Sequence, residues 1–184
     1  LYKNSFDKYL RQIDVNTIRH IFTFNLLSKN EINPKKICLI GDGKLNGLTG
    51  AHLHFPDAKI YSVNLTETLI HDYLILQRSN LDIRNSVSVV DDIKDRDFDT
   101  KLILVPSNNK DFLRNKNIDL FINIVSFQEM TVPEVENYFN IIKNNNSFFY
   151  CCNREEKKLP GGEILSFKNY PWGNGEKYFF ENCP

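Results

Sequence analysis

The chain has 184 residues, enough for one domain with a buried core, and its 23 lysines and arginines balance its 23 aspartates and glutamates. This balance excludes the strong basic field that typically draws proteins to nucleic acid. No apolar run approaches the roughly 20 residues that cross a bilayer, and no secretory signal is visible. We therefore expect a cytoplasmic protein without a membrane span and, because the sequence lacks an initiating Met, a piece of a longer polypeptide.

The first part of the chain predicts a helix, then a strand, then a glycine turn. The segment 14–28 carries apolar residues at mostly helical spacing, and Asp14 or Asn16 can cap its start. The apolar run 35–40 predicts a buried strand, and it stops at the turn Gly41-Asp42-Gly43. This is the order of elements that brings backbone N–H groups close to an anionic or hydroxylated ligand. A glycine turn that joins a strand to a helix without any ligand is the alternative.

Further along, strand-like and helical segments alternate, which predicts βαβ units and an α/β fold with a doubly wound parallel sheet. The expected helices are 48–55, 66–78, 111–115 and 132–143, and the expected strands are 58–65, 118–125 and 147–152. Both 87–90 and 101–105 are strand-like. We expect only one of them to be the third parallel strand and favour 101–105, because a polar loop follows it directly. Turn residues near the end of the chain predict a hairpin that includes 163–167.

Ligands of doubly wound sheets bind beyond the carboxyl ends of the strands, and polar residues are expected there as one rim. They are Gly41, Asp42, Gly43, Asn64, Ser107, Asn108, 126–130 and 153–156. The loop G-D-G-K-L-N-G misses the G-x-G-x-x-G spacing of dinucleotide sites by one residue. Neutral Asn64 also stands where an acidic residue would hold a ribose, although it can equally serve as a strand-end turn. A nicotinamide oxidoreductase is therefore disfavoured.

Gln128 and Glu129 follow a nearly all-apolar strand, which should deliver both side chains to this rim. We expect Phe127 and Met130 to shield the Glu129 carboxylate partly, which would raise its pKa and make it a candidate general base. A glutamate that caps the following helix is an equal alternative.

Metal and disulfide chemistry are not indicated. His52 and His54, two residues apart on a helix, do not share a face, and no C-x-x-C pair occurs. We expect no metal site and reduced cysteines. Asp91 and Asp92 are interpreted as a solvated acidic turn rather than a cation site.

Three segments together resemble the sugar O-methyltransferases, a family of S-adenosylmethionine-dependent enzymes with a Rossmann-like sheet of the class I type. They are I-C-L-I-G-D-G-K-L-N-G at 37–47, D-L-F-I-N-I-V-S-F-Q-E-M at 119–130, and Y-C-C-N-R-E-E-K-K-L-P at 150–160, with Y-P-W following at 170–172. The first is shared by many methyltransferases, whereas the other two are more specific. The resemblance implies S-adenosylmethionine as the cofactor and a sugar, sugar-nucleotide or glycan as the acceptor.

The resemblance also assigns roles to single residues. It places Gly41, Asp42 and Gly43 at the methionine part of the cofactor, Asn64 at its ribose, and Ser107 or Asn108 beside the adenine. It places Asn123, Ser126, Gln128 and Glu129 between cofactor and acceptor, with Glu129 the candidate base, and Asn153, Arg154 and Glu155 on the acceptor side. Trp172 can stack on a sugar face or belong to the core.

Together these assignments predict one methyltransferase-like domain, with a helical cover at 1–33, a cofactor-binding core at 34–152, and acceptor-side loops with a hairpin at 153–184. Because neutral Asn64 replaces the usual acidic residue, a catalytically weak or inactive methyltransferase-like binding module within a larger protein is the alternative.

Overall fold

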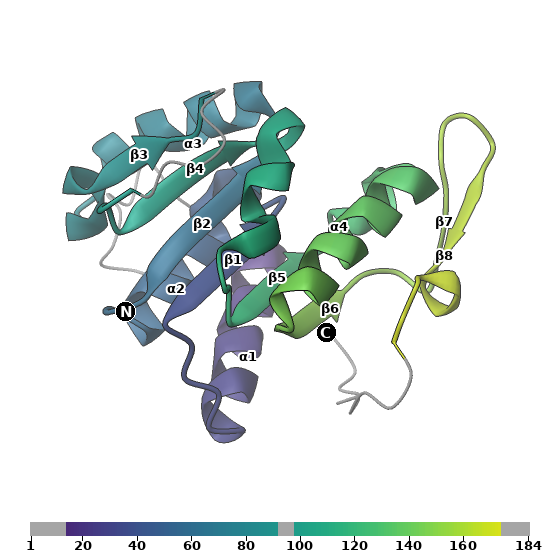
Figure 1. The fold of residues 1–184 in the computed structure, drawn as a ribbon, viewed down its shortest axis with the longest axis horizontal. Coiled ribbons are helices and arrows are strands. Elements are labelled where there is room, and N and C mark those ends of the chain that lie inside the picture. Colours follow the sequence, from purple (N-terminus) through teal and green to yellow (C-terminus); the bar gives the residue numbers. More distant parts are fainter. Residues whose placement is uncertain (1–13, 92–97, 174–184) are drawn as a thin grey trace.

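A six-stranded sheet forms the centre of the protein in a computed structural model that describes residues 14–91 and 98–173 (Figure 1). Its strands lie in the order β3-β4-β2-β1-β5-β6, and every neighbouring pair is parallel. This confirms the predicted doubly wound, Rossmann-like parallel sheet. The strands are β1 (Lys36–Ile40), β2 (Lys59–Asn64), β3 (Val87–Val89), β4 (Leu102–Pro106), β5 (Leu120–Ile124) and β6 (Phe148–Cys152).

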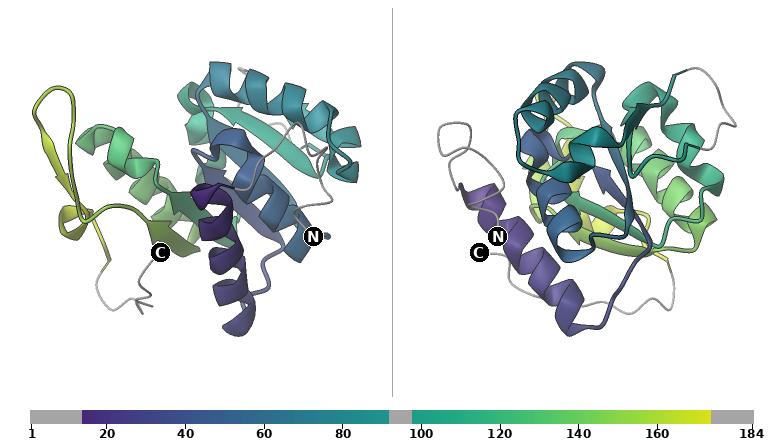
Figure 2. Two further views of the ribbon diagram at one scale, coloured as in Figure 1. Left: turned by 180° about the vertical axis from the view of Figure 1, so that it is seen from behind. Right: turned by 90° about the vertical axis from the view of Figure 1, so that its left-hand side faces the viewer.

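Helices cover both faces of this sheet (Figure 2). One face carries α1 (Val15–Lys29), α2 (Asn46–His54) and α3 (Thr66–Gln77), and the other carries α4 (Val132–Asn145) and the 3₁₀ segment Ser107–Asn115. Alternate residues of β1 therefore enter different cores: Ile37 and Leu39 pack in the first, Cys38 and Ile40 in the second. Burial on both faces explains why the central strands are apolar without interruption.

Local signals set the ends of several elements. The Asp14 carboxylate accepts the Thr17 N–H at 2.8 Å, so Asp14 caps α1 as predicted. Pro133 lies in the first turn of α4, where no intrahelical N–H is needed. The helix is followed by its C-cap residue Asn146, whose backbone is left-handed with φ of +51°.

The middle of the chain corrects one prediction. Both candidate segments are strands: β3 pairs in parallel with β4, with Val87 opposite Leu102. The strand β3 is short, lies at the edge of the sheet and keeps its side chains partly or fully exposed, so its apolar content does not distinguish it from a loop. The residues 92–97 of the connection between the two strands, including Asp92, lie outside the described part.

A small antiparallel hairpin follows the sheet, as predicted. It consists of β7 (Glu156–Lys158) and β8 (Ile164–Ser166) and projects beyond α4 (Figure 1). The chain then returns to the α4 face, where Tyr170 is buried. In the described residues, no helix has the length and apolar character needed to cross a membrane.

Candidate functional site

The order of the strands reverses at β1. The chain adds β2, β4 and β3 on one side of β1 and then crosses to add β5 and β6 on the other. In doubly wound sheets the crevice at such a reversal, beyond the carboxyl ends of the strands, is the place where ligands bind. A cavity of about 270 Å³ lies there, and its lining includes Asn16, Gly41, Gly43, Lys44, Ser126 and Glu129.

The glycine loop after β1 forms part of the lining of this cavity. Gly41 has a left-handed φ of +71°, and a Cβ on it would lie 2.3 Å from the Oγ of Ser126, so only glycine fits. A Cβ on Gly43 would meet no other atom within 4 Å. The two glycines therefore differ: Gly41 allows the strand ends to approach each other, and Gly43 borders open space.

Asp42 connects the loop to α2. Its buried carboxylate accepts the N–H groups of Gly47 and Leu48, each at 2.7 Å. A negative group at a helix N-terminus is favoured by the free N–H groups and by the helix dipole. Both carboxylate oxygens thus bind the protein itself, and Asp42 shapes the loop whose backbone borders the cavity.

Helix α1 contributes to the cavity wall through Asn16 and His20. The His20 Nε2 atom lies 3.8 Å from Oδ1 of Asp42. The sequence predicts this helix only as a cover of the sheet. The spacing of Asn16 and His20, four positions apart and hence on one helix face, is the signal in the sequence that indicates a polar surface there.

Strained backbone gathers around the cavity. Lys44, Leu45 and Val125 all have left-handed φ values, of +64°, +58° and +67°. This conformation is unfavourable for residues with a side chain, and most of all for a β-branched one such as valine. Because such residues cluster at ligand-binding and catalytic sites, their position at the ends of β1 and β5 favours a functional site here.

A buried network around Asn123 connects three strand ends. Its Nδ2 donates to the Ile40 carbonyl at 3.1 Å and to the Ser126 hydroxyl. Its Oδ1 accepts from Nδ2 of Asn153 at 2.7 Å and from the Phe127 N–H at 3.3 Å. Asn123 is fully buried and does not line the cavity, so in this structure it supports the strand ends, and its expected place between cofactor and acceptor stays a prediction.

Gln128 and Glu129 both follow β5 at the rim but differ in burial. Gln128 is buried, and its Oε1 accepts the Arg154 N–H at 3.0 Å, which connects the β5 end to the segment before β7. Glu129 lines the cavity with a side chain that is 56% exposed, and its Oε1 accepts from Nζ of Lys157 at 2.9 Å. This hydrogen bond lowers the pKa of Glu129, so the expected raised pKa is wrong. The local pattern did not show that β7 brings a cation to this carboxylate.

Asn64, Ser107 and Asn108 lie on the same rim, beyond β2 and β4, but not in the cavity lining. Asn64 is opposite Pro106 in the sheet, and its Oδ1 accepts the N–H of Leu65 at 3.0 Å. This contact fits the alternative interpretation of Asn64 as a residue that turns the backbone at the end of the strand. The contacts of these three residues with a ribose and an adenine stay predictions.

The remaining acceptor-side residues do not belong to the cavity lining. Arg154 and Glu155 are exposed between β6 and β7. The Trp172 ring lies 5.0 Å from the rings of Phe139 and Phe167, and its Nε1 donates to the Phe167 carbonyl at 2.9 Å. Trp172 thus packs at the edge of the α4 core, which is the alternative that the sequence left open for it.

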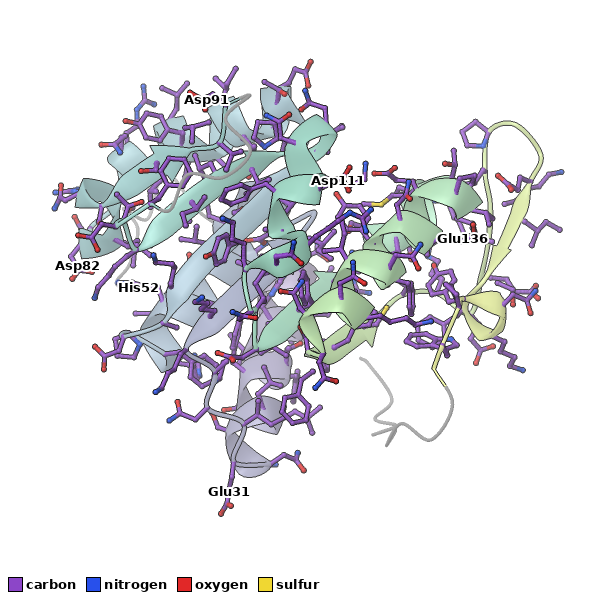
Figure 3. All side chains as sticks on the ribbon, viewed as in Figure 1. Glu31, His52, Asp82, Asp91, Asp111 and Glu136 are labelled. Atoms are coloured by element: carbon purple, nitrogen blue, oxygen red, sulfur yellow. The ribbon has the colours of Figure 1, made fainter. Side chains whose placement is uncertain are left out.

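His52 and Asp82 form a pair away from the cavity, at a distance of 2.6 Å (Figure 3). The hydrogen bond from His52 holds the pKa of Asp82 below its usual range. Nowhere in 14–91 and 98–173 do three or more His, Cys, Asp or Glu side chains gather as metal ligands. The described cysteines Cys38, Cys151 and Cys152 are free thiols.

No protein-family model and no curated protein sequence matches the chain. Solved structures do resemble part of it, and two of them are methyltransferases by name. A protein of Nostoc punctiforme PCC 73102, provisionally assigned as an O-methyltransferase, gives a TM-score of 0.47 with 13% identity, over 79% of this chain and 36% of that one. The plantazolicin methyltransferase BpumL, in complex with S-adenosylhomocysteine, gives a TM-score of 0.44 with 14% identity, over 79% of this chain and 47% of that one. The chain thus spans less than half of either protein, and the fold assignment rests on its own strand order.

Proposed function

We propose that this chain is part of an S-adenosylmethionine-dependent O-methyltransferase that acts on a sugar or glycan hydroxyl. The observation that carries the proposal is the cavity at the β1–β5 reversal. Its lining comes largely from the glycine loop and the segment after β5, and these belong to two of the three segments that resemble the sugar O-methyltransferases.

The residues around the cavity fit such a cofactor in shape and charge. The open space beside Gly43 leaves room for a ligand close to the loop backbone. The cavity is slightly smaller than the roughly 300 to 1,000 Å³ of typical ligand pockets, so it would hold the methionine end, with Asn64 and Ser107 along the rim for the nucleoside. When bound, the cofactor supplies a methyl group on a positively charged sulfonium. The Asp42 and Glu129 carboxylates line the cavity beside Lys44, and they are the groups that this cation would face there.

Glu129 is our candidate for the group that accepts the proton of the acceptor hydroxyl. Its hydrogen bond with Lys157 keeps the carboxylate ionised at neutral pH, so it can accept a hydrogen bond from a hydroxyl, but the same contact lowers its basicity. A positioned base contributes typically about 10² to 10⁴ in rate, and alignment of reactants on the order of 7 to 11 kcal/mol. With a weakened base, alignment by the loop and by acceptor-side residues such as Arg154 would supply most of the acceleration.

Ligand binding tests the proposal first. A ligand at about 100 times its Kd stabilises the folded state by roughly 2.7 kcal/mol, which thermal unfolding detects readily. We expect S-adenosylhomocysteine to raise the melting temperature and NAD to leave it unchanged. Transfer of a labelled methyl group to a panel of sugars, sugar nucleotides and glycans then tests the acceptor class. Stabilisation by NAD alone, or by neither compound, would refute the proposal.

A catalytically weak binding module is the second candidate, and two contacts favour it. The Oδ1 atom of Asn64 is engaged by the Leu65 N–H, and Glu129 is held by Lys157. The first contact weakens the hold on a ribose, and the second weakens the base. Binding of S-adenosylhomocysteine without methyl transfer to any acceptor of the panel would support this candidate.

A further inference from the structure

Asp72 carries a carboxyl group that is fully buried. It lies on the inner side of α3 and is 0% exposed. Its Oδ1 accepts the backbone N–H of Lys44 at 3.2 Å. Its Oδ2 is buried and has no hydrogen-bond partner in the described part of the chain. A buried carboxylate with an unsatisfied oxygen strongly disfavours the charged form.

The charged groups around Asp72 do not compensate such a charge. Asp42, from the glycine loop, is itself negative and opposes ionisation. His71, the neighbour on α3, has its Nδ1 3.8 Å from Oδ1 of Asp72, but its side chain is 64% exposed. The Lys44 ammonium lies on the outside, 3.9 Å from Oδ2 of Asp14.

The two strands that pack under α3 add no charge at this place. Their side chains on this face are uncharged: Ile60 and Ser62 from β2, and Leu102 and Leu104 from β4. Burial first, and the charge of Asp42 second, raise the pKa of Asp72 to about 7.

The contact of Asp72 lies at the strained part of the glycine loop. Lys44 and Leu45 are consecutive residues with left-handed backbone. Such a conformation persists only when surrounding contacts hold it, and the hydrogen bond from the Lys44 N–H to Asp72 is a contact of this kind. Since Lys44 itself lines the cavity, a change at Asp72 reaches the candidate site directly through this hydrogen bond.

We propose that Asp72 is a positioning residue of the glycine loop and that it works as a neutral carboxylic acid. In the protonated form it keeps a carbonyl oxygen for the Lys44 N–H without placing a second negative charge beside Asp42. When the proton passes to solvent, the buried charge is relieved by movement of the loop that admits water. Ligand binding at the loop should therefore weaken as the pH rises through neutrality. The choice of S-adenosylhomocysteine as the test ligand rests on the proposed function, whereas the expected behaviour of the loop does not.

Calorimetric titration with S-adenosylhomocysteine between about pH 6 and about pH 8.5 tests the effect on binding. If only the protonated form binds, the Kd of the wild type rises up to about tenfold per pH unit above neutrality. Asp72→Asn keeps the carbonyl oxygen and cannot ionise, so its Kd should stay constant. Glu67→Gln, on the exposed side of α3, and His71→Gln should keep the wild-type profile, and the latter excludes titration of the imidazole. A constant Kd for the wild type, or an unchanged profile for Asp72→Asn, would overturn the proposal.

Amide hydrogen exchange of the segment 41–48 tests the loop without any ligand. The ratio of wild-type to Asp72→Asn exchange rates should be near one at about pH 6 and about fivefold or more at about pH 8, because ionised Asp72 opens the loop only in the wild type. An unchanged ratio overturns the proposal even if no ligand binds, whereas failure of S-adenosylhomocysteine to bind at any pH refutes only the proposed function. If Asp72→Asn does not fold, the ¹³C carboxyl signal of Asp72 in the wild type decides. A titration midpoint below about 5 would overturn the proposal.

Discussion

Replacing Gly41 with alanine places one methyl group where the structure has no room. The added Cβ would lie 2.3 Å from the Oγ and 2.4 Å from the Cβ of Ser126. Atoms cannot remain at such distances, so either the loop or Ser126 must move. In addition, the φ of +71° at Gly41 is a left-handed value that alanine adopts only at a cost.

The expected loss of stability follows from these two effects. Left-handed backbone costs alanine about 1 kcal/mol relative to glycine, and overpacking of a tight site costs typically about 1 to 3 kcal/mol. Ser126 cannot yield freely, because its hydroxyl donates to the Ile40 carbonyl at 2.9 Å and accepts from Asn123. Loss of those hydrogen bonds adds about 1 kcal/mol. We therefore expect Gly41→Ala to lower the free energy of unfolding by about 3 to 5 kcal/mol.

Urea unfolding followed by circular dichroism measures this loss, and two variants serve as controls. Gly43→Ala meets no neighbouring atom within 4 Å, so its stability should stay within about 1 kcal/mol of the wild type. Ser126→Gly removes both overlapping atoms and leaves Cα at 3.9 Å. In the Ser126→Gly background, Gly41→Ala should lower the free energy of unfolding only by the cost of the left-handed backbone, about 1 kcal/mol. If Gly41→Ala unfolds at the wild-type urea concentration, or costs as much in the Ser126→Gly background as in the wild type, the close approach of the β1 and β5 loops is wrong.

Three further predictions concern charge and ligand binding. Folded Asp72 binds its proton more tightly than the unfolded chain does. The stability of the wild type relative to Asp72→Asn should therefore fall as the pH rises from about 4 to about 7 and then level off, so that Asp72→Asn melts higher than the wild type at about pH 8. Glu129→Gln should keep the Kd for S-adenosylhomocysteine within about twofold while kcat falls by about 10²; wild-type turnover would remove Glu129 as the base. Asn64→Asp should tighten S-adenosylhomocysteine by about 1 kcal/mol in calorimetry, and an equal or weaker Kd would show that residue 64 does not hold the ribose.

The layout of the sheet could be predicted because its strands carry the signal in their own residues. The run at 36–40 is apolar throughout after Lys36 and stops at Gly41, so both the strand and the turn are visible locally. The signal for the start of α1 is equally local, since Asp14 caps this helix by accepting an N–H from a residue only three positions away. The segment that forms β3 is also strand-like, but β3 has only three residues and one neighbouring strand, so its own pattern does not show that it joins the sheet.

The chemistry of the site was harder to predict because it depends on contacts between distant segments. The pKa of Glu129 is set by Lys157, which reaches it from a hairpin beyond β6. Asp72 stands beside His71 in a helix and looks like a surface residue, and its burial follows from the packing of the glycine loop on α3. Trp172 shows the same limit, since an aromatic residue in a loop fits a core, the commoner case, as well as a sugar platform until its neighbours are known.

The polar side chains expected at the ligand divide into two groups once their contacts are known. Both oxygens of Asp42, and both the nitrogen and the oxygen of the Asn123 amide, form hydrogen bonds within the protein. Replacing either residue would therefore alter the loop and the strand ends before it altered any ligand contact. Gly43 and Glu129 border the cavity without fixing the fold around it, since nothing packs on Gly43 and the Glu129 side chain is largely exposed. Loss of ligand binding in Gly43→Val at unchanged stability would therefore report on the site itself, whereas the same loss in Asp42→Asn would report mainly on the helix that Asp42 caps.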